Sequence, residues 1–261
     1  MRYFKILIFY VVMHFLSCKD KASNQNDIYS FEKTSVDHTL FDYLPSSTSN
    51  DVYTNDSYSF SYKEIYEQSE WVAYELTSSD MNNAHYQRPY FNQDNSVKSK
   101  SADWKNYKNS GYNKGHLCPA ADRKSSYNMY KQTFLTSNIS PQISDFNAGI
   151  WNRLEQKTRY WATRYGGLYV ITGGVLKKGL KTIGKENVAV PTYFYKIILT
   201  KDKLNMIAFL VPHEASNASL YSFVVSVDEI EKMTGIDFFK ALPDDLENSL
   251  EGNKGYKNWS F

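Results

Sequence analysis

The sequence predicts an α+β fold with a largely antiparallel sheet, and three observations support this. Four runs rich in strand-forming residues are spread along the chain: Trp71–Thr77, Leu168–Thr172, Pro191–Leu199 and Met206–Val211. Helical signals lie between these runs, and neither an internal repeat nor a regular strand–helix–strand alternation connects them. With 261 residues the chain is long enough for one sizeable domain and a tail, so we expect a single core.

Residues 1–17 predict a signal peptide of the lipoprotein type. Arg2 and Lys5 precede the apolar run Ile6–Leu16, and a small residue and then Cys18 follow it. This run is too short to span a bilayer as a mature helix. Cys18 is the expected lipid-attachment residue, which would anchor the protein to a membrane, and ordinary cleavage without a lipid is the alternative. Either way we expect export, to the periplasmic or outer-membrane side of a bacterial cell envelope or to the medium.

Residues 18–38 are polar and poor in core-forming side chains, so they predict a tether ahead of a folded domain at 39–261. The chain has two cysteines, Cys18 and Cys118, and lipidation of the first leaves no partner for a disulfide. Stability must therefore come from the core. We interpret Cys118 as a packed small residue, because the sequence around it does not suggest a covalent nucleophile.

The distribution of charge is more informative than the net charge. The net charge of +2 is due to the predicted signal peptide, which carries Arg2 and Lys5 and no acid. Between Lys98 and Lys131, however, the chain has eight basic and two acidic residues. This segment predicts a basic surface that attracts phosphates, with a solvated lysine-rich face as the alternative.

Two helices can be placed from their end signals. Ser144 and Asp145 can cap a segment that runs to about Arg164. Ser226 and Glu229 have the spacing of a capping box ahead of a second helix. A glycine at position 235 is a natural end for that second helix.

A histidine in the segment Gly111–Arg123 is the first candidate for chemistry. His116 lies among glycine, proline and small residues, where a backbone can approach a substrate closely. One histidine beside one glycine is a weak signal, and a structural histidine in the core is the alternative.

The helix expected from Ser144 offers partners for this histidine. At 3.6 residues per turn, Glu155 is rotated from Asn147 by about 80° around the helix axis, and Arg159 is rotated from Asn147 by about 120°. The three side chains can therefore line one curved face of the helix. A solvated amphipathic face is the alternative.

These segments together resemble the DNA/RNA non-specific endonuclease family, which includes secreted bacterial nucleases and endonuclease G. The resemblance rests on Asn113-Lys114-Gly115-His116, on Ser137–Gln142 and on Asn147–Glu155, and further blocks extend it from Trp71 to Pro243. It implies a central antiparallel sheet flanked by helices. It also implies a ββα-metal motif, in which a histidine on a strand faces an asparagine on a helix.

The resemblance implies catalytic roles for five residues. His116 would be the general base, and Asn147 the direct ligand of a Mg²⁺ ion, for which Mn²⁺ or another divalent cation can substitute. Glu155 would hold the metal through water. Arg159 and Arg88 would bind or stabilise the phosphate.

The resemblance also implies substrate-binding roles for Lys114, Asn113 and Asn138. Here the chain departs from the family, whose motif usually begins Asp-Arg-Gly-His. Asn113 removes a carboxylate near the metal, and Lys114 keeps the positive charge but loses the bidentate geometry of arginine. We expect weaker metal or phosphate binding from these changes.

The function that the sequence predicts is that of a secreted, sugar-non-specific endonuclease. It would hydrolyse phosphodiester bonds of DNA and RNA by in-line attack of a water that His116 activates, assisted by Mg²⁺. A catalytically weak or inactive nuclease-like envelope lipoprotein, which binds nucleic acid or another partner, is the main alternative. A phosphodiesterase acting on other envelope substrates is a third interpretation, and a homodimer stays open.

Overall fold

The computed structural model describes residues 41–82 and 84–261. The predicted signal peptide, the tether and Cys18 lie outside the described residues, so their boundaries stay predictions. The described fold is one compact unit, Phe41–Phe261. Among the described residues, no helix is both long and apolar enough to cross a membrane.

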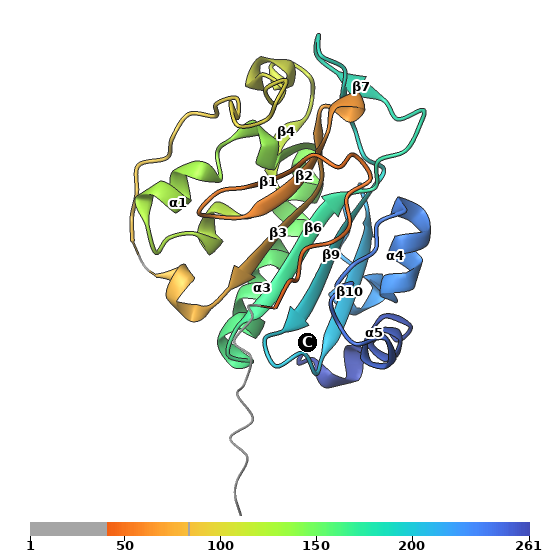
Figure 1. Ribbon diagram of the computed structural model, residues 1–261. Coiled ribbons are helices and arrows are strands. Elements are labelled where there is room, and N and C mark those ends of the chain that lie inside the picture. The colour runs from red at the N-terminus through yellow and green to blue at the C-terminus, as the bar shows by residue number, and fades with distance from the viewer. Residues whose placement is uncertain (1–40, 83) are drawn as a thin grey trace, which may run out of the picture. The chain divides into compact units, whose positions relative to one another are not determined.

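A seven-stranded antiparallel sheet forms the centre of the described unit (Figure 1). In spatial order its strands are β1 (Val52–Thr54), β2 (Ser59–Lys63), β3 (Gln68–Leu76), β6 (Leu168–Gly174), β9 (Tyr193–Thr200), β10 (Met206–Pro212) and β11 (Val224–Val225). The four runs predicted as strands are β3, β6, β9 and β10. They are neighbours in the middle of the sheet, and the predicted α+β class is confirmed.

Helices cover both faces of the sheet (Figure 1). The longest, α3 (Asn152–Arg164), packs on one face, and α4 (Val227–Thr234) and α5 (Asp244–Glu251) pack on the other. Alternate residues of a strand point to opposite faces, so Val72 of β3 joins the α3 side and Ala73 joins the α4–α5 side. The expected single core is therefore divided by the sheet into two main apolar clusters.

Local capping explains where α4 begins and ends. The hydroxyl of Ser226 accepts a hydrogen bond from the backbone N–H of Glu229 at 3.3 Å. Gly235 has a φ of 72°, a left-handed conformation that favours glycine, and ends the helix. The predicted start and end of this helix are confirmed, whereas the predicted cap of the other helix is wrong, because α2 (Ser144–Phe146) follows Ile143 as its N-cap and has no side-chain cap bond.

Two small sheets and shorter helices complete the described fold. The small sheets pair β4 (Asn113–His116) with β5 (Ile139–Gln142), and β7 (Thr182–Ile183) with β8 (Val188–Ala189). The short α-helices are α1 (Tyr127–Gln132) and α2 (Ser144–Phe146), and a π-helical segment, η6, spans Asn147–Trp151. The 3-10 helices are η1 (Glu64–Tyr66), η2 (Ser78–Met81), η3 (Trp104–Tyr107), η4 (Ala120–Asp122), η5 (Thr136–Asn138), η7 (Leu220–Phe223) and η8 (Tyr256–Asn258).

Candidate active site

The hairpin β4–β5 and the helix that follows it bring the predicted catalytic residues into one motif. In the antiparallel register His116 pairs with Ile139, and Gly115 pairs with Ser140. A Cβ at Gly115 would collide with the buried side chain of Gln142, which would have to move, so glycine leaves room for this close pairing. β5 then leads through one residue into α2, which gives the strand–strand–helix arrangement that the resemblance implied.

The helix from Ser144 to Arg164 contains an irregularity at the candidate metal ligand. Phe146, Ile150 and Leu154 recur at every fourth residue along it and are fully buried. The helix is not uniform, however, because Asn147 opens the π-helical segment, within which Gly149 has a non-helical backbone. Such π segments are frequent at functional sites. The side chain of Asn147 is half-buried and makes no hydrogen bond to the described residues, so its amide oxygen is available to a ligand.

His116 is half-buried between aromatic rings and keeps one nitrogen free. Its ring centroid is 5.1 Å from that of Phe134 and 5.6 Å from that of Phe91. Burial, reinforced by the positive charge of Arg88, lowers the pKa of His116 to about 3. The imidazole is therefore neutral at pH 7. Its Nε2 has no hydrogen-bond partner among the described residues.

Two predicted phosphate-binding cations lie beside this histidine. The guanidinium of Arg88 is 5.4 Å from the ring centroid of Phe134, and Lys114 Nζ is 5.3 Å from that of Phe91. Burial and the charge of Arg88 lower the pKa of Lys114. Within the described parts of the chain, neither cation forms a salt bridge. Their charge is thus left for a ligand.

The far part of the helix is tied to a buried polar network. Arg159 Nη1 is 2.8 Å from Oδ1 of Asp122, which is only 1% exposed. The Tyr74 hydroxyl donates to the other oxygen of Asp122 at 2.9 Å. Arg159 is therefore held by Asp122 rather than by Glu155, the partner that an i, i+4 helix pair would have given it.

Glu155 lies near a buried lysine that sequence reasoning missed. Burial raises the pKa of Glu155 to about 7, and the positive charge of Lys196 opposes this rise. Lys196 is fully buried on β9, where its Nζ donates to Thr172 Oγ1 at 2.6 Å. A single lysine within an otherwise apolar strand was the available signal, because lysine is almost never fully buried without a partner.

The structure corrects the predicted substrate contact by Asn138. This side chain is fully buried. Its amide accepts from the backbone N–H of Cys118 and donates to the carbonyls of Cys118 and Thr133, each at 2.8–2.9 Å. Asn138 therefore holds the two loops together and offers nothing to a substrate. Asn113, by contrast, is exposed at the start of β4.

Two other residues of the basic segment are also structural. Cys118 is buried, and burial raises its pKa to about 12, which agrees with the interpretation as a packed residue. Arg123 is 2% exposed and donates to three backbone carbonyls, those of Ser57, Glu75 and Asp122. The predicted basic surface therefore does not include Arg123.

Comparisons with known proteins agree with the motif. The profile of the DNA/RNA non-specific endonuclease family matches residues 39–245. The chain is 37% identical over 209 residues to "Nuclease EXOG, mitochondrial" of Danio rerio, which covers 73% of this chain and 60% of that protein. It is 33% identical over 215 residues to "Nuclease" of Nostoc sp., with coverage of 75% and 76%.

A solved structure shows the same fold. It is that of the EndoG/EndoGI complex, with a TM-score of 0.68 and 28% identity over 74% of this chain and 86% of that one. The chain spans 60% or less of the length of the EXOG nucleases that it matches in Danio rerio, Mus musculus and Homo sapiens.

Proposed function

Because the chain belongs to the DNA/RNA non-specific endonuclease family, we propose that it is an exported, sugar-non-specific endonuclease that cuts DNA and RNA with the help of Mg²⁺. One observation carries the proposal most directly. A neutral His116 lies on the strand hairpin that leads into the helix of Asn147, beside Arg88 and Lys114, which form no salt bridge with the described residues.

His116 acts as the general base. Its imidazole takes a proton from the water that attacks phosphorus, which a positioned neutral imidazole can do. The negative phosphate of a bound substrate draws the pKa of His116 upward from about 3, toward the range in which proton transfer is efficient. The aromatic packing on both Phe91 and Phe134 fixes the plane of the ring.

The residues around Asn147 fit a hydrated Mg²⁺ ion. An amide oxygen without another partner and the carboxylate of Glu155 are the hard oxygen donors that this ion prefers, and it commonly keeps most of its waters. When bound, the ion supplies Lewis-acid stabilisation of the charge on phosphorus and on the leaving oxygen. Lys196 keeps Glu155 partly ionised near pH 7 so that it can orient water.

Arg88 and Lys114 bind the phosphate. Their charges have no acidic partner in the described part of the chain, so binding an anion removes their repulsion. Phosphate contacts of this kind carry no sequence information, which supports cutting without sequence preference. Lys114 gives a point charge where the family motif has arginine, and Asn113 gives no carboxylate, so we expect modest phosphate and metal affinity.

Anchoring through a lipid on Cys18 is also part of the proposal, supported by the sequence of residues 1–18 alone. Cells expressing the full chain are labelled with a palmitate analogue, beside the Cys18→Ser variant. Label on the wild-type protein that is lost in the variant supports the anchor, and equal label or none contradicts it. Light scattering of the purified protein decides whether it is a homodimer.

Cleavage of supercoiled plasmid and single-stranded RNA tests the nuclease function. The assay compares Mg²⁺, Mn²⁺ and EDTA, with His116→Ala beside the wild type. Metal-dependent cutting of both polymers that His116→Ala loses supports the proposal. Absence of cutting by folded wild-type protein, together with retained binding of nucleic acid, favours the catalytically inactive lipoprotein, for which the replacement by Asn113 is the specific observation.

A further inference from the structure

A pocket of about 550 Å³ beside the candidate active site has aromatic walls and a positive charge. Tyr90, Phe91 and Trp104 supply the rings, and Arg88 and Lys114 supply the charge. None of the described residues that line the pocket is acidic. We call these five residues the aromatic pocket.

Two features suit this pocket to a flat ligand. The side chains of Tyr90 and Trp104 are 91% and 39% exposed, although large aromatic side chains usually bury most of their surface. The backbone at Trp104 is fixed, because this residue opens η3, whose start is capped by Asp103 accepting from the N–H of Lys105 at 2.8 Å. Much of the surface of the two rings is thus open to a ligand.

The pocket is continuous with the proposed chemistry. Phe91 contacts both the ring of His116, at 5.6 Å between centroids, and Lys114 Nζ, at 5.3 Å from its ring. Lys114 Nζ is also 5.9 Å from the ring of Trp104. A ligand phosphate near Lys114 and His116 would therefore place the neighbouring base at the rings.

We propose that the aromatic pocket binds an unstacked nucleobase of a single-stranded substrate, next to the phosphate that is cut. This inference rests on the proposed function and names its preferred substrate class. Every base has a face that stacks on an aromatic side chain, so the contact tolerates any sequence. In a duplex those faces are already stacked on neighbouring bases, and the pocket favours single strands for that reason.

Binding to a non-cleaving protein tests the pocket. In a His116→Ala background with EDTA, the dissociation constants of a labelled single-stranded oligonucleotide and of the matching duplex are measured. Trp104→Leu is expected to weaken single-strand binding about tenfold and duplex binding much less. Trp104→Phe should restore binding, and Tyr221→Leu, a change at a similarly exposed aromatic residue outside the pocket, is the matched control.

The outcomes separate this inference from the nuclease function. Equal losses for both substrates, or no loss in Trp104→Leu, overturn the pocket even if the wild type cuts DNA and RNA. A selective loss upholds the pocket even if the wild type does not cut. The thermal midpoint of each variant confirms folding.

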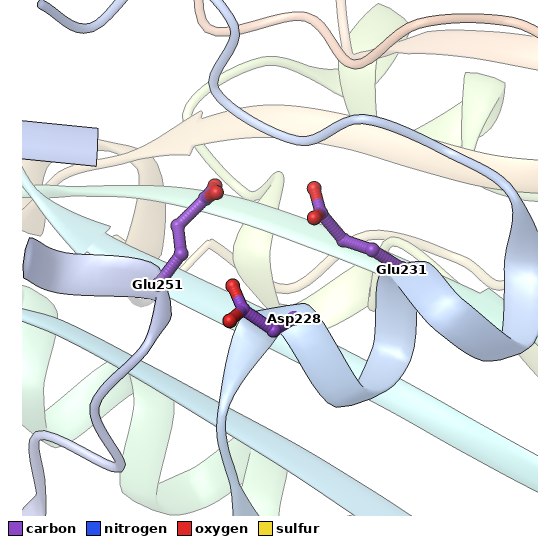
Figure 2. A group of neighbouring side chains, drawn as sticks. All are labelled: Asp228, Glu231 and Glu251. Atoms are coloured by element: carbon purple, nitrogen blue, oxygen red, sulfur yellow. The ribbon is translucent and has the colours of Figure 1, made fainter. Parts of the chain in front are cut away.

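A different observation concerns the opposite face of the sheet, where three carboxylates converge (Figure 2). Asp228 and Glu231 lie one turn apart on α4, and Glu251 is the last residue of α5. One oxygen from each lies within 4.8 Å of the other two. No salt bridge joins any of the three to a basic residue in the described ranges.

Glu251 shows that this acidic group lacks a partner. Its side chain is 5% exposed, and its Oε1 has no hydrogen-bond partner among the described residues. Figure 2 shows its carboxylate directed toward the space that Asp228 and Glu231 also face. A buried carboxylate oxygen without a partner is costly, and nearly all such groups in proteins are satisfied by a donor, a water or an ion.

We propose that Asp228, Glu231 and Glu251 bind a divalent cation of the calcium type, which joins α4 to α5. Carboxylate oxygens from flexible side chains are the ligands that Ca²⁺ takes, with further oxygens from backbone or water. Glu231 keeps one oxygen for this role, because its Oε1 already accepts from the N–H of Phe238 at 2.9 Å. The ion would stabilise the fold and take no part in cutting.

Calcium titrations test this site without interference from the catalytic metal. In an Asn147→Ala background, we expect CaCl₂ to raise the thermal midpoint saturably and to give a binding heat by calorimetry. Glu251→Gln should remove both effects. Asp245→Asn, at the exposed start of α5, is the matched control and should keep them. If calcium gives neither effect, or if Glu251→Gln responds as its parent does, the site does not exist and the carboxylates share protons instead.

Discussion

The two sides of the central sheet carry unpaired charge of opposite sign. On the side of β4, β5 and α3, Arg88 and Lys114 have no acidic partner in the described structure. On the side of α4 and α5, the carboxylates of Asp228, Glu231 and Glu251 form no salt bridge with any described basic residue. Folding tends to pair or expose charges, so charges left together and partly buried indicate where a ligand completes the structure.

The two sides also differ in what surrounds the charge. The cations lie against aromatic rings and beside a neutral histidine. The rings suit a nucleobase, the cations suit a phosphate, and the histidine suits proton transfer. The three carboxylates lie close together on α4 and α5 and form no salt bridge with the described residues, which suits a metal ion. If this contrast is correct, changes on one side will leave the ligand of the other side unaffected.

The largest expected effect is on catalysis by the positive side. His116→Ala should lower the rate of plasmid cleavage by about a thousandfold, because a positioned general base contributes roughly 10²–10⁴. Single-turnover rates at saturating Mg²⁺ measure this effect. The calcium response around Glu251 should stay unchanged in the same variant. A variant with near wild-type rates would remove His116 from the reaction.

The next effect concerns the buried lysine behind α3. Lys196→Met should destabilise the protein by about 1–2 kcal/mol, because buried Thr172 loses its hydrogen-bond partner, while Glu155, with a pKa of about 7, can take up a proton when it loses the compensating charge. Urea unfolding measures this loss, and the double variant Lys196→Met/Glu155→Gln should recover only the part that is due to Glu155. Lys201→Met, on a half-exposed pair with Glu75, is the control and should cost less than about 1 kcal/mol.

A second measurement on Lys196→Met distinguishes a role of Glu155 in metal binding from a purely structural role. Without Lys196, the pKa of Glu155 rises above about 7, so more of its carboxyl is neutral at pH 7. The Mg²⁺ concentration for half-maximal cutting should then rise, and raising the pH should partly restore it. An unchanged Mg²⁺ requirement would mean that Glu155 does not orient metal-bound water.

The sequence predicted those strands of the sheet that are long and buried. The central strands β3, β6, β9 and β10 are long and buried, so their apolar runs stand out. The short edge strands β1 and β11 do not, because two or three residues give no readable pattern. The π-helical segment was missed as well, since a helix prediction assumes 3.6 residues per turn throughout.

The site was predicted less completely, for a reason that particular residues make clear. Asn138 lies in a family-like block, and only its three backbone bonds show that it is structural. Asp122 and Arg159 are 37 positions apart, so their pairing depends on tertiary packing. Motifs identify residue types, whereas burial and partners decide which of them are free to act.

A smaller effect should appear in the pH dependence of stability. In the folded protein the pKa of His116 is about 3, below the ordinary value of 6.5, so the unfolded chain takes up a proton that the folded chain does not. Stability is therefore lost as pH falls below about 6.5, by about 2 kcal/mol at pH 5. Urea unfolding at pH 7 and pH 5 should show a smaller loss for His116→Gln than for the wild type, and equal losses would show that the histidine is not desolvated.

The smallest expected effect comes from adding a carboxylate to the positive side of the sheet. Asn113→Asp adds a carboxylate at the exposed start of β4, where the family motif has one. Because a carboxylate binds a divalent cation more strongly than an amide, the Mg²⁺ requirement for cutting should fall several-fold, a change of about 1 kcal/mol. Asn109→Asp, in the exposed turn before the same strand, is the matched control and should change nothing. If both variants behave like the wild type, position 113 lies too far from the metal to matter, and the modest metal affinity expected here has another cause.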